Sequence, residues 1–259
     1  MINELENNLN IKVTNIKEFK DGTYSKVFLI NNKYLVKENP SLDSEVEFLK
    51  LNNNKYFQNI IYIGNGFNVY NFIEGNVVKS VNNPLELVKI LYEIVSSYNE
   101  TDKDGYGHFY DLRKTFKEFL SIELEDSKDD DNYSFMLNVL DNINDDFKKS
   151  VIHGDFGTHN YIEQDGKLVG IIDPEGILGD PIYDLLFGIV SNIDIIKNID
   201  VDLIFNMIGL TKYHYSLLLI VLFNRIKRSK KYHPEDTLEY IKIFDELKVK
   251  YETLFSDNI

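Results

Sequence analysis

The spacing of hydrophobic and polar positions along this 259-residue chain changes near residue 74, from short apolar runs to a helical repeat. Before it, short apolar runs are separated by turn-forming residues, which is typical of antiparallel strands. Strands are expected over 26–30 and 34–37, joined by a tight Asn-Asn-Lys turn, and a shorter mixed strand over 13–19. A second hairpin with a Gly-Asn-Gly turn is expected over 60–73. This stretch predicts a small antiparallel sheet.

Helical spacing first appears between the two hairpins. Val46 and Leu49 stand three positions apart there, and Ser41 or Ser44 is suited to cap the helix. From Pro84 onward the helical repeat dominates, since proline favours a first helical turn. The helices expected from this point cover 84–95, 112–124, 133–147 and, within 181–259, the apolar stretches 183–189, 203–208, 215–223 and 238–254.

Two short strands, over 151–152 and 168–172, interrupt this helical half. The chain is long enough for two lobes and a sizeable core. We therefore predict an α+β fold with two lobes around a cleft. Residues 1–74 form a small β-rich N-terminal lobe with one helix, and residues 75–259 form a larger, mainly helical C-terminal lobe.

Composition and charge limit the classes of function. The 28 Lys and Arg residues face 42 Asp and Glu residues, which gives a net charge of −14. This charge repels nucleic acid and anionic membranes, so we expect neither as a partner. The absence of cysteine excludes disulfides and thiolate metal sites. The N-terminus lacks a signal-peptide pattern and the longest apolar run, 217–223, is too short to cross a bilayer, so we expect a cytoplasmic protein.

The segment after residue 150 carries three polar side chains in a telling order. Asp155 stands five residues before Asn160, and Asp173 follows thirteen residues after that. A carboxylate can orient an acceptor hydroxyl and take its proton, and kinases place a catalytic Asp, a metal-binding Asn and a metal-binding Asp in this order. Amide and carboxylate oxygens suit Mg²⁺. The pattern predicts phosphoryl transfer, with Asp155 catalytic and with Asn160 and Asp173 as metal ligands.

Two histidines flank this catalytic Asp. His153 lies two residues before Asp155, and a neutral imidazole there is expected to brace the loop by hydrogen bonding to backbone carbonyls. His159 is expected to be exposed and incidental.

The residues of this segment resemble the aminoglycoside phosphotransferase family. The chain reads H-G-D-x-x-x-x-N over 153–160, I-D at 172–173 and G-D-P-x-Y-D-L over 179–185. The family is a branch of the protein-kinase-like fold and includes choline, homoserine, macrolide and hygromycin kinases. The match is firm over 150–190 and looser elsewhere. It implies a bilobal protein-kinase-like fold, ATP or GTP as donor, Mg²⁺ and a small-molecule hydroxyl as acceptor.

The resemblance also implies roles for individual residues. Residues 1–74 become the nucleotide-binding lobe, and residues 75–259 become the lobe that carries catalysis and binds the acceptor. Asp184 matches the family's helix Asp, which holds the catalytic loop from behind. Lys37 resembles the strand lysine that grips the α- and β-phosphates. Glu45 is our choice for its acidic partner, and Glu47 is the rival.

Two further segments of the first lobe match parts of the family. Thr23 and Ser25 lie where a phosphate-covering loop belongs, although the stretch has a single glycine and departs from the G-x-G-x-x-G of protein kinases. Their hydroxyls and the backbone amides around them could meet phosphate. Asn71, Phe72 and Ile73 resemble the hinge, whose backbone pairs with the purine edge.

The acceptor is expected among the helices of the second lobe. An aminoglycoside carries several ammonium groups, and the acids within 123–131 and 141–146, with Glu235, Asp236, Asp245 and Glu246, could attract it. They could equally be a solvated helix face. A cationic, aminoglycoside-type acceptor is our first hypothesis. The alternatives are a metabolic kinase for choline, a sugar or an amino-alcohol and, more distantly, a non-catalytic nucleotide-binding protein on a kinase scaffold.

Overall fold

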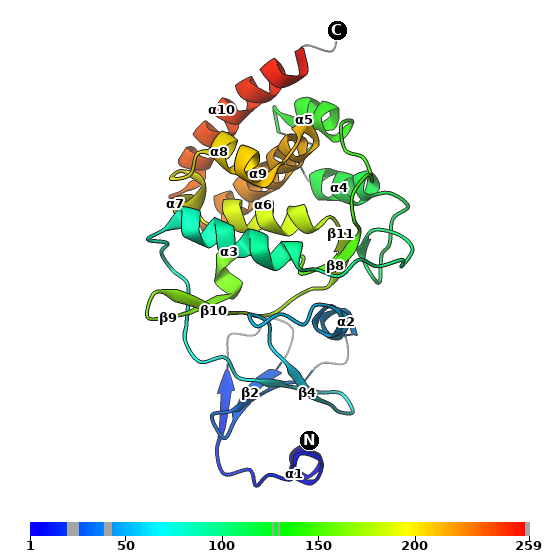
Figure 1. Ribbon diagram of the computed structural model, residues 1–259, viewed down its shortest axis with the longest axis vertical. Helices are drawn as coiled ribbons and strands as arrows, with labels where there is room; N and C mark the ends of the chain where they lie inside the picture. Colours follow the sequence, from blue (N-terminus) through cyan, green and yellow to red (C-terminus); the bar gives the residue numbers. More distant parts are fainter. Residues whose placement is uncertain (20–25, 39–42, 126, 129, 257–259) are drawn as a thin grey trace.

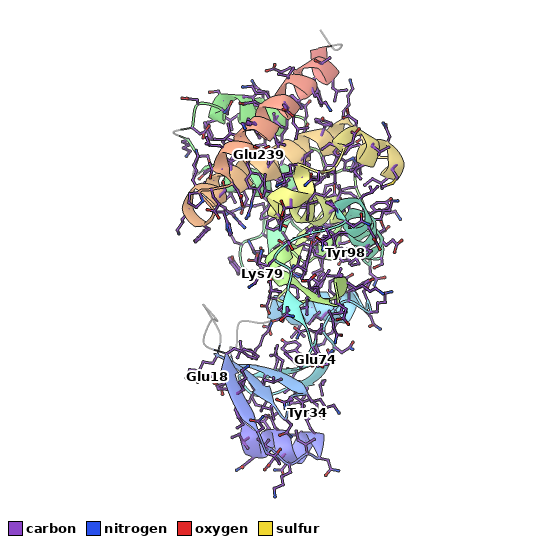
Figure 2. All side chains as sticks on the ribbon, turned by 90° about the vertical axis from the view of Figure 1, so that its left-hand side faces the viewer. Glu18, Tyr34, Glu74, Lys79, Tyr98 and Glu239 are labelled. Carbon is purple, nitrogen blue, oxygen red and sulfur yellow. The ribbon has the colours of Figure 1, made fainter. Side chains whose placement is uncertain are left out.

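The computed structural model describes residues 1–19, 26–38, 43–125, 127–128 and 130–256. It confirms the predicted α+β class, because strands dominate the N-terminal part and helices the C-terminal part. The two parts stack along the long axis of the molecule (Figure 1). Figure 2 places Tyr34 in the lower, strand-rich part, and Tyr98 and Glu239 in the upper, helical part.

The N-terminal part is built on one antiparallel sheet with the strand order β1-β2-β3-β5-β4. Its elements are α1 (Ile2–Leu9), β1 (Ile16–Phe19), β2 (Lys26–Ile30), β3 (Tyr34–Glu38), α2 (Asp43–Leu51), β4 (Ile60–Ile63) and β5 (Asn68–Asn71). The hairpins between β2 and β3 and between β4 and β5 agree with the expected ones. In β3, Val36 pairs with Phe28 of β2 and with Val69 of β5, so this strand lies at the centre of the sheet.

The two faces of the sheet belong to different cores, because side chains alternate along a strand. Val36 faces a small cluster with Ile30, Val69 and Leu5 of α1. Leu35 faces the main core instead, together with residues of α2 and of the helical part. Lys37, two positions from Leu35, therefore shares its face and lies on the α2 side. Helix α1 covers the other face (Figure 1). This helix was not predicted from the sequence, which indicated a single helix in this lobe.

Two small three-stranded sheets follow, with the orders β10-β9-β6 and β7-β11-β8. Their strands are β6 (Asn76–Val77), β7 (Gly107–His108), β8 (Ser150–Ile152), β9 (Tyr161–Gln164), β10 (Lys167–Ile171) and β11 (Ile177–Gly179). A short 3-10 turn, η1 (Thr158–Asn160), leads into β9. The proposed boundary after residue 74 falls between β5 and β6 and stays a prediction.

Helices make up the rest of the C-terminal part. They are α3 (Pro84–Ser96), α4 (Phe116–Glu125), α5 (Tyr133–Leu140), α6 (Pro181–Ser191), α7 (Ile193–Ile196), α8 (Val201–Ile208), α9 (Lys212–Tyr232) and α10 (Thr237–Ser256). Helix α9 is central because its run 217–223 is buried on all sides between α6 and α10. The helix expected over 133–147 ends at Leu140, and Asp145 instead accepts a hydrogen bond from the backbone N–H of Phe116 at 2.9 Å.

Helix α2 joins the two parts of the molecule. Its Phe48 packs edge-on against Phe57, Tyr98 and His153. At its C-terminal end the Asn52 amide donates to the carbonyl of Val151 in β8 at 2.8 Å. Helix α2 is therefore attached to the strand that leads into the Asp155 loop. Across the described part of the chain, no helix combines the length and the apolar character that a membrane span requires.

Candidate active site

Antiparallel pairing brings Asn160 and Asp173 together. Tyr161, the first residue of β9, pairs with Ile171, the last residue of β10. The residues just outside the ladder are therefore neighbours, and the backbone N–H of Ile172 donates to the carbonyl of Asn160 at 3.0 Å. Asp173 comes next, with φ 58°, a left-handed conformation that is uncommon outside glycine, and its side chain is 53% exposed.

Asp155 is held in the same loop by two side chains. The Asn160 amide donates to the backbone carbonyl of Asp155 at 2.8 Å and to its carboxylate Oδ2 at 3.1 Å. The Nε2 atom of His159 lies 2.9 Å from the same Oδ2. Burial opposes ionisation of Asp155, but the hydrogen bond from His159 and the positive charge around the carboxylate outweigh it, so the pKa of Asp155 is lowered.

Lys37 connects the sheet to this loop. Its Nζ lies 2.5 Å from Glu45 Oε1 and 2.6 Å from Asp173 Oδ1. Lys37 and Glu45 are both almost completely buried, at 5% and 3% exposed. Burial lowers the pKa of Lys37, but the two carboxylates outweigh this effect and leave the pKa raised, so the ammonium stays charged. The rival acid, Glu47, pairs instead with Lys103 at 3.3 Å on the surface.

Asp184 lies behind the loop, on α6. It is fully buried and accepts hydrogen bonds from the backbone N–H groups of His153 at 2.7 Å and Gly154 at 3.0 Å, and from the Tyr98 hydroxyl at 3.0 Å. Burial raises the pKa of Asp184 to about 7, because these donors only partly replace the water that the carboxyl has lost. The contacts tie the start of the Asp155 loop to a core helix.

His153 is neutral and braces the loop from within. Burial lowers the pKa of this imidazole to about 4, and its Nε2–H donates to the carbonyl of Ile172 at 3.0 Å. Its own carbonyl accepts from the backbone N–H of Glu175 at 2.8 Å. His153 therefore links the segment before Asp155 to the segment around Asp173.

The three hinge candidates, Asn71, Phe72 and Ile73, make different contacts in the structure. The backbone N–H of Phe72 already donates to the carbonyl of Lys33 at 2.9 Å, and the Asn71 carbonyl accepts from Gln58 at 3.2 Å. The Ile73 side chain packs against Gly170 so closely that a Cβ at position 170 would lie 2.6 Å from it. Thr23 and Ser25 lie outside the described residues.

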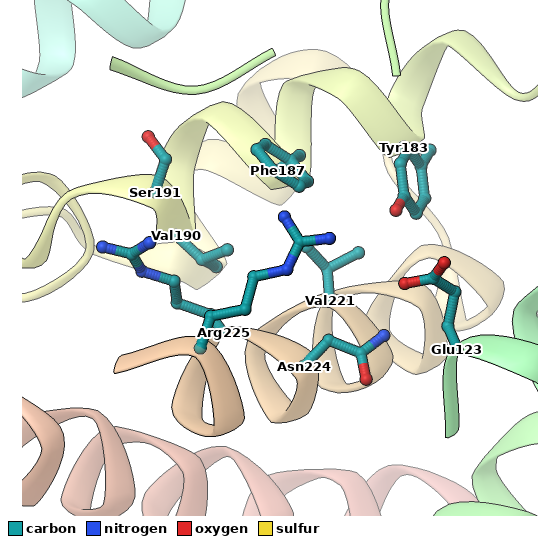
Figure 3. Close-up of a pocket in the computed structure, with 9 residues that line it drawn as sticks. Glu123, Tyr183, Phe187, Val190, Ser191, Val221, Asn224 and Arg225 are labelled. Carbon is teal, nitrogen blue, oxygen red and sulfur yellow. The ribbon is translucent and has the colours of Figure 1, made fainter. Parts of the chain in front are cut away.

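A cavity of about 1430 Å³ opens beside Asp155, Thr158 and His159. Its charged lining, counted over the described residues, comprises the acids Glu123, Glu125, Asp155, Asp194 and Asp236 and the bases Lys79, Lys197, Arg225, Lys227, Arg228 and Lys231. Of the acids expected to attract a cation, Glu123, Glu125 and Asp236 face this space. A small adjoining pocket lies between α6 and α9, where Tyr183 and Phe187 face Val221 and Asn224 (Figure 3).

Several contacts around Asp155 were not anticipated from the sequence. His159, which was expected to be incidental, touches the Asp155 carboxylate. Glu175 lies near the same carboxylate, and burial followed by the negative charge of Asp155 raises the pKa of Glu175 to about 7. Its position two residues after Asp173, a predicted site residue, was a signal in the sequence that Glu175 lies near the site. The bases of α9 that line the cavity, Arg225, Lys227, Arg228 and Lys231, form a visible cluster in the sequence, but the wholly apolar run 217–223 before them does not show which way they face.

The comparison with family models decides the family. The model of the phosphotransferase enzyme family matches residues 53–200, more than half of the chain. The chain belongs to this phosphotransferase family. The phosphotransferase is thus an enzyme of the kinase type, and the match includes Asp155, Asn160 and Asp173 within its span.

Solved structures share the fold of this phosphotransferase over nearly its whole length. The GDP complex of aminoglycoside 2'-phosphotransferase-IIIa is 15% identical, with a TM-score of 0.58 and coverage of 95% of this chain and 96% of that chain. A thermostable mutant of APH(4)-Ia, in a ternary complex with AMP-PNP and hygromycin B, is 15% identical with a TM-score of 0.61, and the match covers 96% of this chain and 97% of that chain. ADP-bound APH(2'')-Ib is 19% identical with a TM-score of 0.56, and the match covers 95% of this chain and 96% of that chain. A search of curated proteins found no match.

Proposed function

We propose that the protein transfers the γ-phosphoryl group of ATP or GTP to a hydroxyl group of a small molecule. The observation that carries this proposal is the unbroken line of contacts from Glu45 through Lys37 to Asp173, and from Ile172 through Asn160 to Asp155. Phosphoryl transfer needs little covalent chemistry from the protein, so catalysis depends on positioning and on charge. One connected set of a cation, an amide and three carboxylates supplies both.

Asp155 is the residue that meets the acceptor hydroxyl. Its carboxylate borders the cavity, and its lowered pKa keeps it ionised near neutral pH. An ionised carboxylate can accept a hydrogen bond from the attacking hydroxyl and then take its proton. Asp184 and His153 keep this loop in place through the backbone contacts described above.

The oxygen atoms around Asp155 fit a Mg²⁺ ion. Asn160 donates through its amide nitrogen, and no hydrogen bond from the described residues reaches its Oδ1. Asp173 has one oxygen on Lys37, and its exposed side chain leaves the other open. An amide and a carboxylate oxygen are the hard donors that Mg²⁺ prefers. Asn160 and Asp173 would hold the ion, which would neutralise charge on the triphosphate.

Lys37 and the hinge would bind the nucleotide. The permanently charged Lys37 ammonium is suited to the α- and β-phosphates, and Glu45 keeps it in place. Because the Phe72 N–H and the Asn71 carbonyl are already engaged, the purine edge is assigned to the backbone of Ile73. Thr23 and Ser25 remain candidates for phosphate contacts from the covering loop.

An aminoglycoside-type acceptor is the first candidate. Solved structures of this fold include complexes with hygromycin B, with kanamycin and with streptomycin. Ammonium groups of such a molecule would find Glu123, Glu125 and Asp236 in the cavity beside Asp155. The net charge of −14 would attract a polycation from solution.

A second acceptor class, a metabolic hydroxyl compound, is favoured by one observation. Six Lys and Arg side chains line the cavity against five acids in the described chain, although acids outnumber bases overall. Arg228 lies over the Phe187 ring at 5.7 Å, and none of the described carboxylates lies within ion-pair distance of it. A guanidinium in this setting suits a carboxylate or phosphate. A sugar phosphate or a hydroxy acid would use it.

A coupled nucleotide-turnover assay tests the proposal. The panel contains aminoglycosides, hygromycin, macrolides, choline, homoserine, simple sugars and sugar phosphates. We expect one class to stimulate release of nucleoside diphosphate, and we expect Asp155→Asn to lower that turnover by about 10²- to 10⁴-fold while nucleotide still binds. Full turnover in Asp155→Asn would overturn the assignment. Nucleotide binding without transfer to any acceptor, or to water, would favour the non-catalytic alternative.

A further inference from the structure

The contact between His159 and Asp155 has a defined chemistry. The Nε2 atom of His159 lies 2.9 Å from Asp155 Oδ2. An ionised carboxylate only accepts hydrogen bonds, so Nε2 must carry the hydrogen and donate it. The same Oδ2 also accepts from the Asn160 amide at 3.1 Å. One carboxylate oxygen therefore takes two donors from adjacent residues.

The other oxygen is left for the acceptor. Within the described chain no hydrogen bond reaches Asp155 Oδ1, and both Asp155 and His159 line the cavity. A single donor would leave the carboxylate free to rotate about its last bond, whereas two donors on Oδ2 restrict that rotation. We propose that His159 is a positioning residue, which turns Oδ1 of Asp155 toward the acceptor hydroxyl. This inference rests on the proposed role of Asp155.

The backbone beside His159 leaves space for its ring. A Cβ placed on Gly157 would lie 2.6 Å from Cε1 and 2.7 Å from Nδ1 of His159. Gly157 has φ −106°, a conformation open to any residue, so the backbone itself does not require glycine. The missing side chain is needed because the imidazole occupies that volume.

The turn that carries His159 is anchored to the core. The backbone N–H of Thr158 donates to Ser191 Oγ at 3.0 Å, and Ser191 Oγ donates to the carbonyl of Gly188 at 2.8 Å. Both partners belong to α6, the helix that also carries Asp184. The His159 side chain is 55% exposed, yet its base is fixed, so the ring is held at the edge of the cavity.

Four variants separate positioning from simple packing. Gln at position 159 can place an amide N–H near the native Nε2, whereas Asn is too short to reach Asp155, and Phe keeps the ring but has no donor. We expect His159→Phe and His159→Asn to lower kcat about tenfold, because the carboxylate loses its orientation, with KM for the nucleotide unchanged. His159→Gln should retain most of the activity. Gly157→Ala should push the ring away and lower kcat in the same way.

Turnover is measured with the acceptor identified by the panel, or with water as acceptor where the panel identifies none. If Gly157→Ala acts through His159, adding it to His159→Phe should change kcat no further. Long-range ¹H–¹⁵N spectra at alkaline pH give a readout without activity, in which His159 should show the Nε2–H tautomer and respond to Asp155→Ala.

Two results would overturn the role of His159: wild-type kcat in His159→Phe, or equal losses in His159→Gln and His159→Asn. Full turnover in Asp155→Asn would instead reject the proposed function itself, so the two failures are distinguishable.

Discussion

Replacing Glu45 with Gln removes one charge from the buried ion pair with Lys37 and leaves the shape of the side chain almost unchanged. The pair is separated by 2.5 Å, and both residues are almost fully buried. At an effective dielectric constant of 20, two unit charges at this distance attract each other by about 7 kcal/mol, before the cost of removing both from water. Most of that attraction is offset by lost hydration.

The expected loss in the free energy of unfolding depends on the partner that Lys37 keeps in Glu45→Gln. Breaking a buried pair typically costs about 3–5 kcal/mol, because the other charge is left without a partner. Here Asp173 still lies 2.6 Å from Lys37, so we expect the lower end of that range, about 3 kcal/mol. Nucleotide affinity should fall as well, since Lys37 would no longer be held from two sides.

Glu47→Gln is the matched control, on the same helix and with the same chemical change. Glu47 is paired with Lys103 at 3.3 Å, and both side chains are about a third or more exposed. An exposed pair of this kind contributes about 0.5 kcal/mol or less. Urea denaturation, followed by the fluorescence of the 17 tyrosines in a chain without tryptophan, measures both variants. With a slope of about 3 kcal/mol per molar, the Glu45→Gln midpoint should fall by about 1 M.

Equal midpoint shifts in the two variants would contradict a stabilising role of the buried Lys37–Glu45 pair, and so would an unchanged midpoint together with unchanged nucleotide affinity in Glu45→Gln. Lys37→Met completes a double-mutant cycle, and a coupling energy near zero between positions 37 and 45 would show that their contact does not stabilise the protein.

Three further outcomes are expected. Asp173→Ala should remove the Mg²⁺ dependence of nucleotide affinity, and calorimetry that shows the same affinity with and without Mg²⁺ in the wild type would contradict the metal assignment. Burial raises the pKa of Asp180 to about 6, so the folded state keeps this proton to a higher pH than the unfolded state does. The free energy of unfolding should therefore decline by about 2 kcal/mol from pH 4 to pH 6, and urea titrations of Asp180→Asn should show a smaller decline. Arg228→Glu should raise KM for an anionic acceptor and lower it for a polycation; equal KM values in both enzymes would exclude Arg228 from acceptor binding.

Spacing was enough to predict that Asn160 and Asp173 lie beside each other. Asn160 and Asp173 flank a two-stranded ladder, so an antiparallel hairpin between them brings both ends together. Helical phase also favours Glu45 over Glu47, because Glu45 stands three and four positions before the buried Phe48 and Leu49. These features depend on local geometry, which a sequence pattern records.

Features that depend on tertiary packing were not accessible in this way. Helix α1 repeats its apolar residues Ile2, Leu5 and Leu9 at helical spacing, but with eight residues it is too short to be stable without its packing on the sheet. The contact of His159 with Asp155 depends on the conformation of a three-residue turn, which spacing does not reveal. The direction of the α9 bases depends on the rotation of a helix that is buried on all sides over 217–223, and that apolar run contains no information on the angle.

The attachment of α2 limits how this molecule can open to admit a nucleotide. Asn52 ties the helix to β8, Phe48 is packed among residues of the C-terminal part, and the Ser44 carbonyl lies so near Gly176 that a Cβ there would sit 2.2 Å from it. Helix α2 should therefore move as one rigid body with the C-terminal part. Lobe opening then becomes a swing of the five-stranded sheet alone, and each such swing must draw Lys37 out from between its two carboxylates.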